Sequence, residues 1–139
     1  MRIAYYATLL GCMLPLVDLP AAQGDDDQAK LQGKWTVETF EYNGNPVELM
    51  KDAVREFKDS KYTLAPIMRE AIEGTLKLDE TKKPKEIDLA INGRTLKGIY
   101  ELDGDTLKMS YNLGDAERPT EFVSKPDSGL VLVVHKRAK

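Results

Sequence analysis

Hydrophobic and polar residues alternate along most of the chain beyond residue 33, and this pattern predicts short β-strands. Two faces alternate in residues 34–42, with Trp35, Val37 and Thr39 on one and Thr36, Glu38 and Phe40 on the other. A period of two in β-branched and aromatic residues is typical of a strand. The same pattern predicts strands over residues 61–64, 72–79, 87–91, 96–102, 106–111, 121–124 and 130–136.

Turn dipeptides between these segments predict that consecutive strands are antiparallel neighbours. Asn92-Gly93 and Asp103-Gly104 each separate two alternating segments, as in tight hairpins. Little helix is expected between the strands, so a βαβ arrangement is disfavoured. The order of elements favours an all-β fold of about eight antiparallel strands, either a sandwich or an up-and-down barrel.

One segment near the N-terminal end has the spacing of a helix. Val47, Met50, Val54 and Phe57 follow each other at intervals of three or four residues, with Pro46 at the start. Proline is frequent in the first turn of a helix, and this spacing places apolar side chains on one face. We therefore expect one short amphipathic helix or turn over residues 46–57.

The totals limit the partners of the chain. Its 139 residues correspond to one domain, and 20 Lys and Arg against 23 Asp and Glu give a net charge of −3. A nucleic-acid partner is not expected, because neutralising phosphates requires a positive excess. The only cysteine, Cys12, lies in an apolar N-terminal segment. The domain is thus expected to contain neither a disulfide nor a cysteine-bound metal.

Residues 1–24 have the features of a signal peptide. Arg2 supplies a positive start, an apolar stretch follows, and Ala22-Gln23-Gly24 is a small-x-small cleavage site. We expect export to the periplasm, the cell envelope or the medium, followed by an acidic flexible tail over 25–30. Two alternatives remain: a membrane anchor, although the stretch is shorter than the ~20 residues of a span, and lipid attachment at Cys12.

Both ends of the expected domain resemble a known superfamily. Gly33-Lys34-Trp35 opens the first strand and Arg137 closes the last, which resembles the Gly-x-Trp and terminal Arg of the lipocalin and calycin superfamily. The resemblance implies that the guanidinium of Arg137 lies across the indole of Trp35. Gly33, Trp35 and Arg137 would then form a structural plug at the closed end of a barrel.

The middle of the chain is similar to an uncharacterised lipocalin-like domain family that is abundant in planctomycete bacteria. The matching motifs are Leu78-Asp79, Lys83-Pro84-Lys85-x-Ile87-Asp88, Lys97-Gly98-Ile99-Tyr100-Glu101-Leu102-x-Gly104-Asp105-x-Leu107-Lys108, Arg118-Pro119-Thr120-Glu121-Phe122 and Lys136-Arg137. The resemblance covers nearly all of residues 31–137. It implies an up-and-down lipocalin-like barrel, often exported, and carries no assigned activity.

A barrel of about eight strands can enclose one small ligand, so we expect an exported module that binds a small apolar molecule. Candidate cavity residues share the inward face of their strands: Tyr62, Leu76, Leu89, Tyr100, Leu107, Met109 and Tyr111. The alternative is a packed barrel without a ligand that serves as an interaction or scaffold domain in the cell envelope. A filled interior with an exposed apolar patch would favour it.

No catalytic residue, metal site or cofactor is expected. His135 is the only histidine, and no cysteine or Ser-His-Asp arrangement accompanies it. The charged residues of the matching motifs, among them Asp88 and Arg118, are expected to form surface ion pairs. We therefore expect a binding or interaction domain and not an enzyme.

Overall fold

A computed structural model describes residues 26–67, 69–114 and 117–138 of the chain. The expected signal peptide over 1–24 and Cys12 lie outside the described residues. The elements are α1 (Asp26–Leu31), β1 (Gly33–Tyr42), β2 (Asn45–Pro46), the short 3₁₀ turn η3 (Glu48–Met50), β3 (Val54–Lys58), β4 (Lys61–Ala65), β5 (Ile72–Asp79), β6 (Lys85–Ile91), β7 (Arg94–Asp103), β8 (Thr106–Asn112) and β9 (Leu130–Arg137).

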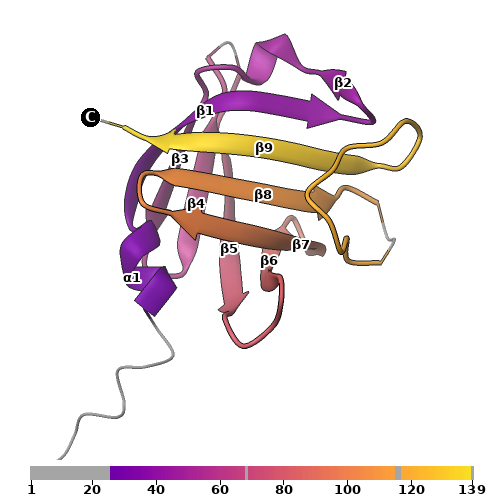
Figure 1. Ribbon diagram of the computed structural model, residues 1–139. Coiled ribbons are helices and arrows are strands. Elements are labelled where there is room, and N and C mark those ends of the chain that lie inside the picture. Colours follow the sequence, from indigo (N-terminus) through magenta and orange to yellow (C-terminus); the bar gives the residue numbers. More distant parts are fainter. Residues whose placement is uncertain (1–25, 68, 115–116, 139) are drawn as a thin grey trace, which may run out of the picture.

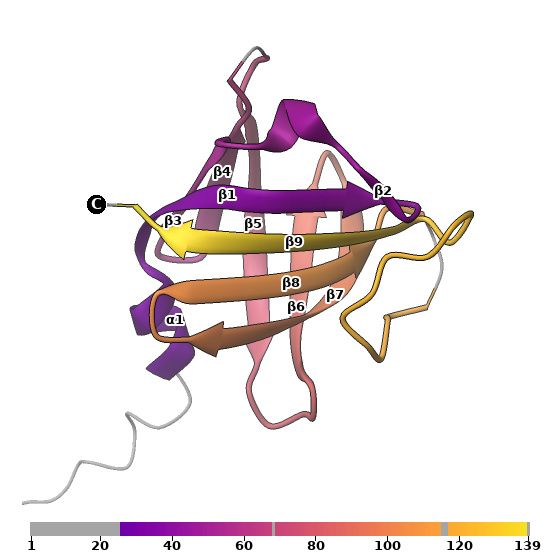
Figure 2. The same ribbon diagram turned by 45° about the horizontal axis from the view of Figure 1, so that its top comes forward.

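The strands form a closed antiparallel barrel. β1 and β3 to β9 pair in chain order, and β9 pairs back with β1, so eight strands surround the interior and β2 is a short extension beside β1. The closing register runs from Trp35 opposite Arg137 to Tyr42 opposite Val131. In both ribbon views β1, β9, β8 and β7 cross in front of β5 and β6 (Figures 1 and 2). The all-β barrel predicted from the sequence, with one short helix near the N-terminal end, is confirmed.

Hairpin turns that the dipeptides predict are present. Asn92 and Gly93 both have positive φ, 49° and 79°, and connect β6 to β7 as a two-residue turn. Gly104 has a φ of 58° between β7 and β8. These positions require the left-handed conformation that asparagine and glycine tolerate.

Two local predictions are wrong. The one short α-helix of the described residues is α1 and does not lie over residues 46–57, which contain the end of β2, the 3₁₀ turn η3 and most of β3. β3 pairs with β1 on one side and β4 on the other, so ladder hydrogen bonds satisfy its backbone. The expected strand over 121–124 is a loop segment. The number of barrel strands still agrees with the prediction, because β3 was not predicted and the predicted strand over 121–124 does not form.

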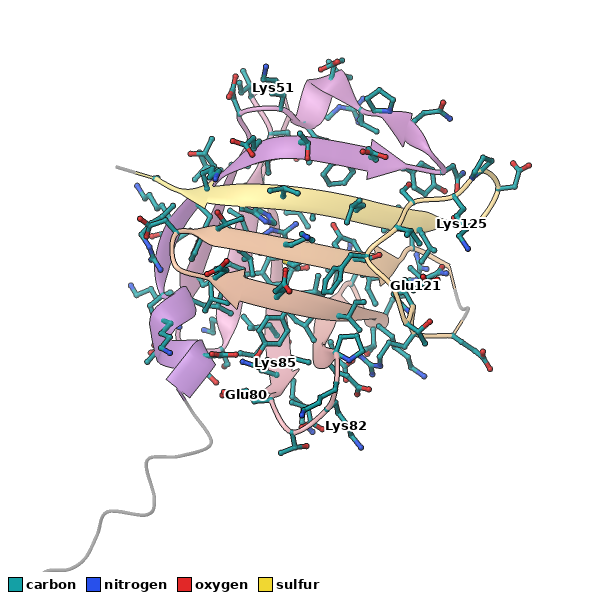
Figure 3. All side chains as sticks on the ribbon, in the orientation of Figure 1. Lys51, Glu80, Lys82, Lys85, Glu121 and Lys125 are labelled. Carbon is teal, nitrogen blue, oxygen red and sulfur yellow. The ribbon has the colours of Figure 1, made fainter. Side chains whose placement is uncertain are left out.

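The segment expected to be an acidic tail over 25–30 is folded from Asp26 onwards, and residue 25 lies outside the described part. Asp27 in α1 is 4% exposed, and its Oδ2 accepts hydrogen bonds from Lys85 Nζ at 2.8 Å and Tyr100 Oη at 2.7 Å. Burial opposes the charge of this carboxyl, but the hydrogen bonds from Lys85 and Tyr100 dominate and lower its pKa. Figure 3 shows Glu80 and Lys85 beside α1.

Helix α1 and the Trp35 side chain close this end of the barrel. Trp35 is completely buried, and its Nε1 donates a hydrogen bond to the Leu31 carbonyl at 2.8 Å. The guanidinium of Arg137 lies 4.3 Å from the centroid of the Trp35 ring and donates to the Lys30 carbonyl. This is the stacking that the lipocalin resemblance implies, and it joins the first and last strands.

A bulge in β1 changes which residues point inward. The register with β9 shifts between Val37 and Thr39. Trp35 and Val37 are inside the barrel before the bulge, whereas after it Phe40 lines the interior and Thr39 is exposed. The prediction that Thr39 shares a face with Trp35 is therefore wrong, because an extra residue in one strand inverts the alternation.

Residues 117–129 cover the outer face of β7 and β8. Ser110 Oγ donates to the Val123 carbonyl at 3.2 Å, and Arg118 pairs with Asp88 at 2.8 Å and with Glu86 at 3.4 Å. Glu121 and Lys125 belong to this segment (Figure 3). Arg118 thus anchors the segment to the outside of the barrel, in agreement with the expected ion pairing.

Gly98 is expected to be necessary for barrel packing. A Cβ added at Gly98 would lie 2.6 Å from both the Ser110 carbonyl oxygen and Tyr111 Cβ. Gly98→Ala should lower the free energy of unfolding by about 1–3 kcal/mol, because the clash requires strands β7 and β8 to shift. Urea unfolding followed by circular dichroism measures this loss. Thr95→Ala, at an exposed position of the same strand, is the control, and equal stability of both variants would contradict the prediction.

Candidate functional site

A cavity of about 300 Å³ lies inside the barrel at the end opposite α1. It is formed by the second half of β1 and of β6, by β3, β4 and the start of β5, by the first part of β7, by the end of β8 and by the residues around η3. The lining residues are Phe40, Tyr42, Val47, Met50, Arg55, Tyr62, Leu64, Ile72, Leu89, Ile91, Leu96, Tyr111 and Leu113. Most are aliphatic or aromatic, so the cavity favours an apolar occupant.

The polar part of this cavity is built around Arg55 of β3. Arg55 is 1% exposed although it carries a permanent positive charge. Its Nε donates to His135 Nε2 at 3.1 Å, and its Nη2 donates to Tyr111 Oη at 3.4 Å. Both partners are neutral groups. Among the described residues, no carboxylate forms an ion pair with Arg55.

His135 accepts a hydrogen bond from the guanidinium of Arg55 and fixes its position. Its Nδ1 lies 3.0 Å from the Leu107 carbonyl oxygen, to which only a protonated Nδ1 can donate. Its Nε2 is then the acceptor for Arg55, so the ring is the neutral Nδ1–H tautomer. Complete burial, together with the charge of Arg55, lowers the pKa of His135 to about 3. The imidazole therefore remains uncharged and adds no positive charge to the site.

Tyr62 completes the polar group. Its ring centroid lies 5.4 Å from the Arg55 guanidinium carbon, a cation–π contact. Burial raises the pKa of Tyr62 to about 12, although the nearby charge of Arg55 opposes the rise. The hydroxyl is thus protonated at neutral pH, and it has no hydrogen-bond partner among the described residues. Arg55 and Tyr111 are hydrogen-bond donors among the residues that line the cavity, and the Tyr62 hydroxyl is buried.

The cavity reaches the surface at the rim. Tyr42 and Ile72 line it and are 37% and 39% exposed. A surface groove of about 650 Å³ adjoins the cavity and shares Val47, Met50 and Ile72 with it. Leu49 in this groove is 60% exposed. A ligand therefore has a route from the surface into the barrel, which is mainly apolar but includes Arg69 and Glu70 in the groove.

The structure divides the predicted cavity residues into two groups. Tyr62, Leu89 and Tyr111 line the cavity. The others are buried in the barrel core but do not line it: Leu76, Tyr100, Leu107 and Met109. Tyr100 belongs instead to the α1 end, where burial and its hydrogen bond to Asp27 raise the pKa of its phenol.

Arg55 is not among the residues predicted from the sequence, and no role was expected for His135. Arg55 lies in the segment that was predicted as a helix, where a charged residue between Val54 and Phe57 fits a solvent-exposed face. His135 was a usable signal, because it continues the inward alternation of Val131 and Val133 along β9. A histidine in that position requires buried partners, and Arg55 and the Leu107 carbonyl are these partners.

Comparison with family models, with curated proteins and with solved structures found no match for this chain. In the described part of the chain, no helix is long and apolar enough to cross a membrane. The described residues also contain no group of three or more His, Cys, Asp or Glu side chains that could hold a metal ion.

Proposed function

We propose that this protein is an exported, lipocalin-like binding module that holds one small, mainly apolar molecule in the cavity at the open end of its barrel. The observation that carries the proposal is the apolar cavity of about 300 Å³, which reaches the surface between Tyr42 and Ile72. Ligand sites of small-molecule binding proteins are concave, mainly apolar and contain a few polar groups. Export is part of the proposal through the features of residues 1–24.

The cavity volume suggests the size of the ligand. A water molecule in the liquid occupies about 30 Å³, and a methylene group is of similar size, so 300 Å³ accommodates about ten such groups. A longer chain would extend past the rim into the groove around Leu49. A compact ligand or an alkyl chain of about ten carbons therefore fits the cavity.

A series of straight-chain alcohols tests this proposal. Titration calorimetry of the protein without its signal peptide, from 1-hexanol to 1-dodecanol, should show affinity rising by about 0.8 kcal/mol for each added methylene. The increase should level off near about ten carbons, where the cavity is full. The same ligands should raise the melting temperature, because they bind only the folded state.

A matched pair of variants locates the binding. Ile91→Trp places a large side chain in the cavity and should abolish alcohol binding. Leu102→Trp changes another half-buried apolar residue that does not line this cavity, and it should leave binding unchanged. No alcohol binding to the wild-type protein, or binding that survives Ile91→Trp, would contradict the proposal.

A scaffold domain in the cell envelope is the second candidate function. It is favoured by the exposure of Leu49 and Ile67, which are 60% and 63% exposed. Exposed apolar side chains of this kind are frequent at protein interaction surfaces. This candidate predicts no ligand, so native mass spectrometry of protein purified from its own envelope separates the two: a co-purifying small molecule supports the binding module, and a bare polypeptide mass supports the scaffold.

A further inference from the structure

The charged groups of the cavity indicate that its ligand has a charged end as well as an apolar part. Arg55 is the only charged side chain among the described residues that line the cavity. Its hydrogen bonds within the described part of the chain go to His135 and Tyr111, which are both neutral, and use two of the five N–H donors of a guanidinium. Arg55 is therefore a buried positive charge with which no carboxylate of the described residues forms an ion pair.

A buried charge without a counter-ion is costly, and proteins nearly always pair it. Hydrophobic residues of similar volume would fill the position of Arg55 more favourably in a barrel that serves only as a scaffold. The structure also builds a support for this side chain, because His135 accepts from Nε and Tyr62 lies against the guanidinium. Arg55 also lines the cavity and has N–H groups beyond the two that His135 and Tyr111 accept, and a cation supported in this way is suited to bind an incoming anion.

The other polar groups near Arg55 also favour a ligand that accepts hydrogen bonds. Tyr111 accepts from Arg55, and its own O–H remains to donate. The buried hydroxyl of Tyr62 has no partner among the described residues. His135 uses its only free lone pair for Arg55. Arg55 can only donate, and the tyrosine hydroxyls can donate as well as accept, so the site favours a ligand group that accepts several hydrogen bonds.

We propose that the molecule bound in the barrel is an amphipathic monocarboxylate, with its carboxylate on Arg55 and its alkyl chain along the apolar wall toward Tyr42 and Ile72. This inference rests on the proposed function. A carboxylate matches the planar guanidinium and carries the single negative charge that one arginine neutralises. The cavity of about 300 Å³ sets the chain at about ten carbons, so decanoate is the probe.

Three ligands with alkyl tails of nine or ten carbons test the head group on the wild-type protein. Titration calorimetry at neutral pH should rank decanoate above 1-decanol and 1-decanol above decyltrimethylammonium. The expected advantage of decanoate over decanol is about 10- to 150-fold, as for hydrogen bonds to a charged group. Decanol binding equal to or tighter than decanoate binding would overturn the monocarboxylate assignment while leaving the proposed function intact. Binding of none of the three would instead contradict the proposed function.

Two variants then locate the carboxylate. Arg55→Met keeps an unbranched side chain but removes the charge, and it should lose the advantage of decanoate over decanol while decanol binding is retained or improved. Lys97→Met removes one positive charge at an exposed position of β7 and should leave both affinities unchanged. An unchanged preference for decanoate in a folded Arg55→Met variant would overturn the role of Arg55. If Arg55→Met does not fold, the ranking on the wild-type protein decides the proposal alone.

Discussion

Trp35→Ala is expected to lower the free energy of unfolding by about 3–5 kcal/mol, the loss typical of a large buried aromatic side chain. Trp35 is completely buried at the α1 end of the barrel. Its removal leaves a cavity, deprives the Leu31 carbonyl of its hydrogen bond and removes the ring under Arg137. Because Trp35 is the only tryptophan in the chain, chemical unfolding should be followed by far-ultraviolet circular dichroism.

Two further substitutions separate the contributions at this site. Trp35→Phe keeps much of the apolar volume but removes the Nε1–H donor, so its loss should be smaller than that of Trp35→Ala. Leu49→Ala, at a position that is 60% exposed, should have little effect on stability. An unfolding curve of Trp35→Ala that coincides with the wild-type curve would exclude Trp35 as the plug of the barrel.

The free energy of unfolding is expected to decrease as the pH falls below about 6.5, the pKa of a histidine in an unfolded chain. His135 has a pKa of about 3 in the folded protein, so between these values the unfolded state binds a proton that the folded state does not. Stability must then fall with falling pH, by at most about 1.4 kcal/mol for each pH unit. Protonation would also place a second positive charge beside Arg55.

His135→Gln isolates this effect, because His135 is the only histidine in the chain and glutamine does not titrate. Urea unfolding of both proteins between about pH 6.5 and 4.5 avoids most of the carboxyl titration, which is centred near about 4. The pKa of Asp27 is lowered, so its contribution is lost only at still more acidic pH. Equal slopes for the two proteins in this range would contradict the assignment of a buried, neutral His135.

The strand predictions succeeded where buried residues alternate with more accessible ones. In β6, Ile87 and Leu89 are buried and alternate with half-buried residues, so the pattern is visible in the sequence. The prediction failed for β3, because one of its two inward residues, Arg55 and Phe57, is charged. A charged residue at an inward position breaks the alternation, and the spacing of its apolar neighbours then resembles that of a helix.

The candidate site was predicted only in part, because the alternation shows which residues point inward but not where along the barrel they lie. Inward parity selects Tyr62, Leu89 and Tyr111, which line the cavity, but it equally selects Leu107 and Met109, which fill the core. Parity reports the face of a strand and not the depth of a residue along the barrel. Phe40 was assigned to the wrong face, because the bulge in β1 has no signature in the alternation.

The sequence by itself determined the all-β class, the meander order and the tight turns, because these depend on contacts and φ preferences between residues close along the chain. It also pointed to the stacked pair Trp35 and Arg137 through the resemblance of the two chain ends. Only the tertiary structure decided that β3 is a strand, that α1 is folded on Asp27, and that Arg55 meets His135 across 80 positions of the chain. These features depend on barrel closure, which brings distant strands together and determines which buried charge has a partner.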